Sequence, residues 1–282
     1  MTSTRNSFDP NSHMSTPVEF EPINGQHSIK EVSITLFLAA PIVKPSRFTE
    51  LFKTVLREKF HKAEVLNTVE VKLKSNISSN DHKAGTKVNN DAGFKFTRFD
   101  ESGQPEIIFQ GVNEDNRSFF SFHTLSYTRW NAFLKEFQDV IDLIRGELAN
   151  IYVIAFGLHY IDQFIWNSED QIDYTLLFKT DSLIIPPKLF ESPIAELLLR
   201  YMSNSGELPH ATRIQIETEP EEKAVISISH NIIHKLDDIS ELNSSQGEDV
   251  LIRLLNIAHR FNKEDLSSML TDDVLLKIGL KK

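Results

Sequence analysis

The side chains of this chain that could do acid–base chemistry are histidines and carboxylates, because its 282 residues include no cysteine. Without thiols, the chain has no disulfide, no thiolate metal ligand and no cysteine nucleophile. Four titratable residues stand out because apolar residues surround them: His123, His159, Asp162 and His259. Such groups suit general acid–base catalysis, but they more often make hydrogen bonds that hold a fold together.

His159 and Asp162 belong to the segment Gly157-Leu-His-Tyr-Ile-Asp-Gln-Phe164. In a regular strand these two side chains point to opposite faces, so we do not expect them to form a pair. Asp162 shares its face with Tyr160, and a carboxylate there needs either a partner or water at the strand end. We therefore favour a structural hydrogen-bonding role for Asp162 over catalysis.

His259 lies at the edge of the apolar stripe of a predicted C-terminal helix, next to Leu255 on the helical wheel. From there it could reach a polar group on the strand that carries Asp162. A contact between His259 and Asp162 would raise the pKa of the histidine and fix its ring. We interpret such a contact as a structural clasp rather than an active site.

Two further groups of histidines have simple structural interpretations. His123 shares a predicted strand face with Arg117 and Ser121, which is typical of a solvated sheet surface. His230 and His234 have the spacing of zinc ligands on a helix, but the flanking pattern is that of a strand, on which the two rings lie roughly 13 Å apart. No glutamate stands where a zinc protease has its base. We therefore expect no metal and no cofactor.

The charge of the chain argues against general binding of nucleic acids. Its 30 Lys and Arg face 40 Asp and Glu, which gives a formal charge of −10 that repels phosphate. Tyr127 and Trp130, at a predicted helix start, are the aromatic residues that we consider for binding, but few basic residues lie between the aromatic ones. The sequence also has no glycine-rich phosphate loop and no nucleophile elbow.

Hydrophobic periodicity predicts the elements of the first half. Alternating residues predict strands over residues 31–38, 68–73, 94–99, 106–112 and 118–125. Helical spacing predicts helices over 46–60 and 130–148, with Thr128 as the cap of the second. The polar stretch 75–93 is predicted to be a mobile loop, and short turns between the later strands indicate an antiparallel meander.

The second half shows similar signals. Residues 151–166 are apolar and rich in β-branched and aromatic residues, which predicts a long central strand. Ser192-Pro193 predicts a helix that runs to about residue 202. Residues 213–219 and 224–233 predict a hairpin, and helices are predicted over 247–261 and from Thr271 onward.

Together these elements predict an α+β fold. We expect a largely antiparallel sheet with helices packed on one face, and the order strand, helix, strands, helix occurring twice. Residues 28–282 would form a single domain with two related halves, at about 28–150 and 151–282. Residues 1–27 are predicted to be disordered. Part of that segment, Ser12-His13-Met14, resembles a cloning remnant; if it is one, the natural chain would start at Met14, and the sequence does not tell whether residues 1–13 are native.

No apolar stretch approaches the roughly 20 residues that a membrane-spanning helix needs, and the N-terminal residues do not resemble a secretory signal. We therefore expect a cytoplasmic protein without a membrane partner. The oligomeric state is not predicted.

Three segments together resemble a known family. They are Tyr127-x-x-Trp130-x-x-Phe133, Phe156-Gly-Leu-His-Tyr-Ile-Asp162, and His259 followed by Leu266 and Leu270-Thr-Asp272. The chain from about residue 28 onward is similar to a sporadically distributed, uncharacterised prokaryotic family of slightly shorter proteins. Its members usually read Gly-Leu-Arg-Tyr-Ile-Asn on the strand and Ile-Thr-Asp near the C-terminus. This chain has His159 in place of the usual Arg, Asp162 in place of Asn, and Leu266 in place of Phe.

The resemblance implies a fold and a prokaryotic, cytoplasmic setting, but not a reaction. The patchy distribution of the family suggests a component of a mobile-element, defence or toxin–antitoxin system. We expect a non-catalytic protein-interaction module with a protein partner, which the 75–93 segment could contact. The alternative is a hydrolase or nuclease component with His123, His159, Asp162 or His259 in an acid–base role, which requires these residues to share a cleft.

Overall fold

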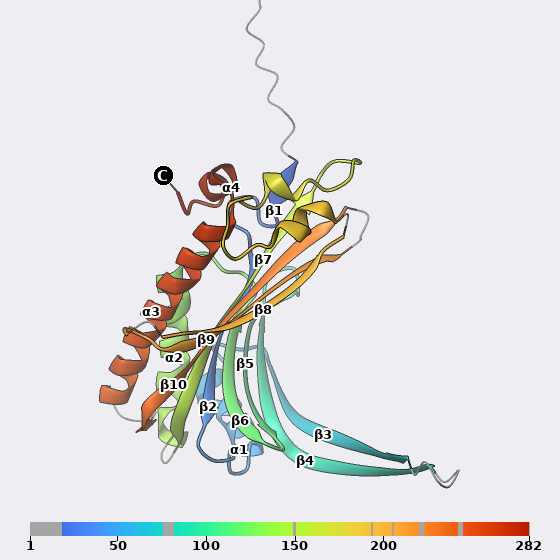
Figure 1. Cartoon of the computed structure of the whole chain (residues 1–282). Coiled ribbons are helices and arrows are strands. Elements are labelled where there is room, and N and C mark those ends of the chain that lie inside the picture. Colours follow the sequence, from blue (N-terminus) through green and yellow to red (C-terminus); the bar gives the residue numbers. More distant parts are fainter. Residues whose placement is uncertain are drawn as a thin grey trace, which may run out of the picture.

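A single antiparallel sheet of ten strands is the framework of the protein (Figure 1). The computed structural model describes residues 19–75, 82–148, 151–192, 194–204, 206–219, 223–241 and 245–281. The strands are β1 (Phe20–Pro22), β2 (Ile29–Leu38), β3 (Lys62–Ser75), β4 (His82–Phe99), β5 (Pro105–Glu114), β6 (Arg117–Thr124), β7 (Tyr152–Trp166), β8 (Glu196–Ser203), β9 (His210–Glu219) and β10 (Val225–Glu241).

The strand order places the start of each half at the centre of the sheet. The order is β3-β4-β5-β6-β2-β7-β10-β9-β8, and the short β1 pairs with the end of β7. β2 and β7 pair with each other, and each also pairs with the last strand of its own half, β6 or β10. From the centre outward, the strands of each half then follow in reverse chain order. All these pairs are antiparallel, which confirms the predicted α+β class with a largely antiparallel sheet.

Helices cover one face of this sheet. They are α1 (Ser46–Leu51), α2 (Trp130–Ile144), α3 (Ser245–Met269) and α4 (Asp272–Lys277), with a π-helical turn at Phe52–Leu56 and 3₁₀ turns at Arg145–Glu147, Tyr174–Leu176 and Pro187–Glu191. α2 and α3 lie side by side (Figure 1), and the indole N–H of Trp130 on α2 donates to Asn256 Oδ1 on α3 at 2.6 Å. Among the described helices, none is long and apolar enough to cross a membrane.

Aromatic packing explains much of the phenylalanine content. Phe94 on β4 stacks on Phe48 of α1 at 4.6 Å between ring centroids and meets Phe109 and Phe120 of the neighbouring strands. All four rings are buried. These residues therefore form the core under the helices, as their spacing predicts, rather than a surface for stacking bases.

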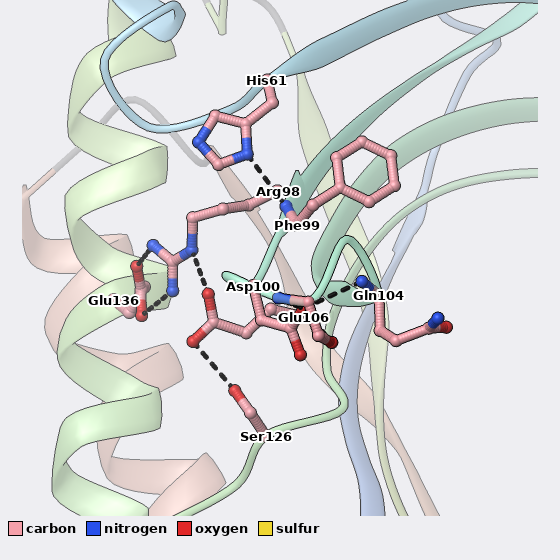
Figure 2. Close-up of polar contacts among 9 residues, drawn as sticks. His61, Arg98, Phe99, Asp100, Gln104, Glu106, Ser126 and Glu136 are labelled. Carbon is pink, nitrogen blue, oxygen red and sulfur yellow. Dashed lines mark hydrogen bonds and ion pairs between the residues drawn. The ribbon is translucent and has the colours of Figure 1, made fainter.

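An arginine on the sheet joins α2 to two strands (Figure 2). Arg98 on β4 donates from Nε to Glu106 on β5 at 2.8 Å and from Nη2 to Glu136 on α2 at 3.1 Å. Glu106 also accepts a hydrogen bond from Ser126 at 3.0 Å. The guanidinium thus fixes how α2 lies on the sheet, because its donors have a rigid planar geometry.

The predicted helix over 192–202 is wrong, because Glu196–Ser203 is the edge strand β8. Leu197 and Leu199 turn toward the helix-covered face, whereas Leu198 and Arg200 are exposed. This is a period of two residues, and pairing with β9 satisfies the backbone on that side. The order strand, helix, strands, helix is therefore not repeated: in the described residues between β7 and β8 there are two 3₁₀ turns and no α-helix.

Other boundaries also differ from the predictions. The predicted 75–93 loop is wrong from residue 82 onward, since His82–Phe99 is a strand; residues 76–81 lie outside the described ranges. Backbone pairing of β4 with β3 outweighs the polar composition, and this hairpin extends beyond the rest of the sheet (Figure 1). The helix predicted to end near residue 261 continues to Met269. Phe20–Pro22, within the segment predicted to be disordered, forms β1, while residues 1–18 lie outside the described ranges.

The packing under α1 gives a test of the core. We expect Gly111→Ala to destabilise the protein by about 1–3 kcal/mol, because a methyl group there would lie 2.5 Å from Phe94 Cε1 and 2.8 Å from Phe120 Cε1. Gly146→Ala is the control, since nothing lies within 4 Å of its added carbon. Urea unfolding measures both changes, and equal stabilities for the two variants would contradict this packing.

Candidate functional site

A cavity of about 300 Å³ lies between β7, the start of α2, α3 and the residues after α4. It brings together Tyr127 and Trp130 from the end of the first half with Asp162 and His259 from the second. Two larger hollows, one along α3 and one beside residues 167–172, are more open and have no buried titratable side chain in their walls. The smaller cavity is therefore the better candidate for a functional site.

Asp162 lies in the wall of this cavity and is only 1% exposed. Its Oδ1 accepts a hydrogen bond from the Ser28 hydroxyl at 2.5 Å, while its Oδ2 is buried without a hydrogen-bond partner among the described residues. Burial raises the pKa of Asp162 to about 6, although the Ser28 hydrogen bond and the nearby His230 act in the opposite direction. A buried carboxylate oxygen without a donor is rare, because it forfeits the hydrogen bonds of water.

Two tyrosines stand close to Asp162 in the same wall. The rings of Tyr127 and Tyr160 meet edge to face, 6.4 Å apart between centroids. Burial and the negative charge of Asp162 raise the pKa of Tyr127 well above its ordinary value. The pKa of Tyr160 is raised by burial and by the nearby Tyr127 and Asp162. Both phenols therefore stay neutral and can donate or accept hydrogen bonds.

His259 is held between two aromatic rings. It stacks on Trp130 with 4.4 Å between centroids and an interplanar angle of 10°, and its Nδ1 lies 2.8 Å from the Tyr160 hydroxyl. Burial and the positive charge of Lys263 lower the pKa of His259 to about 4. The ring is therefore neutral at pH 7, and the simplest assignment has the Tyr160 O–H donate to Nδ1.

The predicted clasp between His259 and Asp162 is wrong in its partners. Both side chains reach the same cavity, but His259 pairs with Tyr160 and Asp162 pairs with Ser28. The pKa of His259 is lowered rather than raised, because the ring is buried and Lys263 lies nearby. The indole N–H of Trp130, one of the two aromatic residues considered for binding, donates to Asn256.

Exposed basic side chains stand at the mouth of the cavity. Arg129 and Lys263 line it, and neither has an ion pair or a side-chain hydrogen bond within the described residues. α2 begins here with Arg129 as its N-cap, without a capping side chain and without an acidic residue in its first turn. Thr128, predicted as the cap, lines the cavity but does not fill that role. The mouth is therefore positive, whereas the inner wall carries Asp162.

The other two candidate residues lie on the opposite face of the sheet. His159 Nε2 lies 2.7 Å from Ser229 Oγ, and burial lowers its pKa. His123 Nδ1 lies 2.7 Å from Glu31 Oε1, and this hydrogen bond lowers the pKa of Glu31. As strand alternation predicts, His159 and Asp162 do not meet. The four candidates thus divide into two groups that cannot act together.

His123 contacts Ser121 at 2.9 Å, but Arg117 pairs with Glu114 instead of joining them. His230 Nδ1 accepts from Asn262 Nδ2 at 2.5 Å, and His234 Nδ1 lies 2.6 Å from the carbonyl oxygen of Pro209. Each ring thus has a structural partner of its own. In the part of the chain that the structure describes, no group of three His, Asp or Glu side chains could hold a metal ion.

Sequence reasoning missed Ser28, Arg129 and Lys263. Lys263 could have been found, because it lies one helical turn after His259 and therefore shares its face. Ser28 stood at the border of the segment predicted to be disordered, and no local pattern connects it with Asp162, 134 residues away.

The raised pKa of Asp162 predicts how stability depends on pH. Because ionisation is harder in the folded protein, the stabilising contribution of this group is greatest below its unfolded pKa of 3.8 and is lost as the pH rises toward about 6. Asp162→Asn cannot ionise, so its stability relative to that of the wild type should rise by about 2.5 kcal/mol between pH 4 and pH 7.5.

Urea unfolding at both pH values measures this difference. Asp139→Asn is the control, because Lys135 and Lys59 lower the pKa of Asp139, so its difference in stability from the wild type should change little between these two pH values. A gap between Asp162→Asn and the wild type that is the same at both pH values would show that Asp162 ionises normally.

In comparisons with known proteins, no family model and no curated protein matches this chain. The family resemblance carried by Tyr127, Trp130 and Phe133 therefore stays a prediction. Without a matching protein, a function can be inferred only from the geometry of the cavity.

Proposed function

We propose that this protein is a non-catalytic binding protein whose cavity takes one small molecule. The observation that carries the proposal is the Asp162 carboxylate in the cavity wall, buried and with one oxygen that no described residue supplies with a donor. A ligand with a hydrogen-bond donor would satisfy that oxygen. Three aromatic residues, Tyr127, Trp130 and Tyr160, give the apolar surface that such a site needs.

The hydrogen bonds around the cavity favour binding over catalysis. The Ser28 hydroxyl donates to Asp162, whereas His259 is hydrogen-bonded to Tyr160, so Ser28 and His259 do not form the serine–histidine pair of a hydrolase triad. His259 is stacked on Trp130 and hydrogen-bonded to Tyr160, which fixes its ring. Side chains held in this way suit recognition of a fixed ligand shape, because little entropy is lost when the ligand binds.

A second candidate is the acid–base enzyme considered from the sequence. What favours it is that Asp162 and His259 share one cavity and that the pKa of Asp162, about 6, lies near neutral pH. His159 and His123 could not take part, since they lie on the opposite face. This hydrolase or nuclease component would show turnover that His259→Phe abolishes.

The protein partner and the mobile-element, defence or toxin–antitoxin setting remain predictions from the sequence. We propose that a partner would contact the β3–β4 hairpin, which reaches beyond the sheet (Figure 1) and includes much of the 75–93 segment. Such a contact is independent of the cavity.

Fluorescence of Trp130 can test the cavity as a binding site. The chain has two tryptophans, so Trp166→Phe leaves Trp130 as the sole indole in direct contact with the proposed ligand. We expect saturable quenching by at least one class of small amines, acids or neutral alcohols, with a Kd between about 1 μM and 1 mM. His259→Ala should weaken that binding by at least about tenfold, because the ring forms part of the wall.

Val250→Ala is the matched control, since this exposed residue on α3 does not line the cavity. Absence of saturable quenching by all three classes would contradict the proposed function. Turnover of a substrate that is lost in a His259 variant would instead support the second candidate, the acid–base enzyme.

A further inference from the structure

The inner end of the cavity is built to receive positive charge. The unpartnered Oδ2 of Asp162 is the only acceptor there that carries a formal charge, among the described cavity residues. The hydroxyl oxygens of Tyr127 and Tyr160 are close enough to Asp162 for its charge to act on both. An ammonium group offers three donors, which suits one carboxylate and two phenol oxygens.

A neutral His259 favours the binding of a cation beside Asp162. Since the pKa of His259 is lowered to about 4, the imidazole does not repel a cation at neutral pH. Tyr127 and Trp130 also present aromatic rings, whose faces attract ammonium groups. Pairing with a cation offsets the cost of keeping the Asp162 carboxylate out of water.

The mouth of the cavity is built to receive negative charge. Lys263 and Arg129 are exposed there and have no carboxylate partner among the described residues. α2, a helix of 15 residues, also begins at this cavity, and its first turn has no capping side chain. A carboxylate at the mouth would meet both the basic side chains and the positive end of the helix.

Between these two ends the wall is apolar, because Ile29, Leu266 and Leu280 line it. The cavity has a volume of only about 300 Å³, so the ligand is small. We propose that the ligand is a small zwitterion, with an ammonium group at Asp162, a short apolar middle, and a carboxylate at Lys263, Arg129 and the start of α2. This inference rests on the proposed binding function and names its ligand class.

Calorimetry with a series of ω-amino acids tests the proposal directly. Glycine, 3-aminopropanoate, 4-aminobutanoate and 6-aminohexanoate place the two charges at increasing distances. Butylamine and butanoate each carry one charge only. We expect one member of the series to bind at least about tenfold more tightly than either singly charged compound.

Two variants distinguish the contributions of the two ends of the cavity, and a third serves as the control. Asp162→Asn should weaken both the zwitterion and butylamine at least about tenfold, whereas Lys263→Gln should weaken the zwitterion about three- to tenfold and leave butylamine unchanged. Arg253→Gln is the matched control, because this exposed arginine of α3 lines a different hollow. It should change no affinity.

The pH gives a test that needs no variant at Asp162. Its pKa of about 6 predicts that the affinity for butylamine falls as the pH drops from 7 to 5, because protonation removes the negative charge. This measurement keeps the proposal falsifiable if Asp162→Asn does not fold.

Each contrary result has its own meaning. Equal affinity for butylamine and the best zwitterion, unchanged by Lys263→Gln, would overturn the role of the mouth but leave the binding function in place. Tight binding of butanoate alone, unaffected by pH between 5 and 7, would overturn the role of Asp162. If no compound binds and Trp130 fluorescence responds to none of the three wider classes, the proposed function itself fails.

Discussion

The pairing of β7 with both β2 and β10 is the constraint on which the rest of the structure depends. Hydrogen bonds on its two sides fix the register of β7, so that Tyr160 and Asp162 must face the helices while His159 must face away. A slip of one residue would exchange these faces and put the imidazole of His159 under α3. The position of the cavity, the burial of Asp162 and the separation of the two histidine groups all follow from this register.

The buried carboxylate makes the site costly to build. Removing Asp162 from water raises its pKa to about 6, and a single hydrogen bond from Ser28 compensates only part of the loss. An asparagine at this position would carry no such charge. Replacing Asp162 by asparagine would therefore make the folded protein more stable at neutral pH but would remove the negative charge from the cavity. A residue that lowers stability in this way is typical of a functional site.

Sequence reasoning reaches the elements whose pattern is local. Strict alternation gives β2 and β9, and the apolar run gives β7, so the pattern alone is enough to put Asp162 and Tyr160 on one face. It fails where tertiary pairing decides: the apolar residues of Glu196–Ser203 fit a helix or a strand, and only the neighbouring β9 selects the strand. It also cannot choose between Tyr160 and Asp162 as the partner of His259, because that choice depends on how α3 is rotated on the sheet.

The cavity cannot be recognised from a single sequence motif, because its residues come from separate segments of the chain. Tyr127 and Trp130 come from the end of the first half, Asp162 from the start of the second, and His259 from the helix that closes the second. These segments meet only because β2 and β7 pair at the centre and because α2 and α3 pack on the same face. Neither half alone has both the Asp162 carboxylate and the rings of Tyr127 and Trp130. A ligand that bridges them would bind only the assembled sheet, so its binding would stabilise the junction between the halves as well as the site.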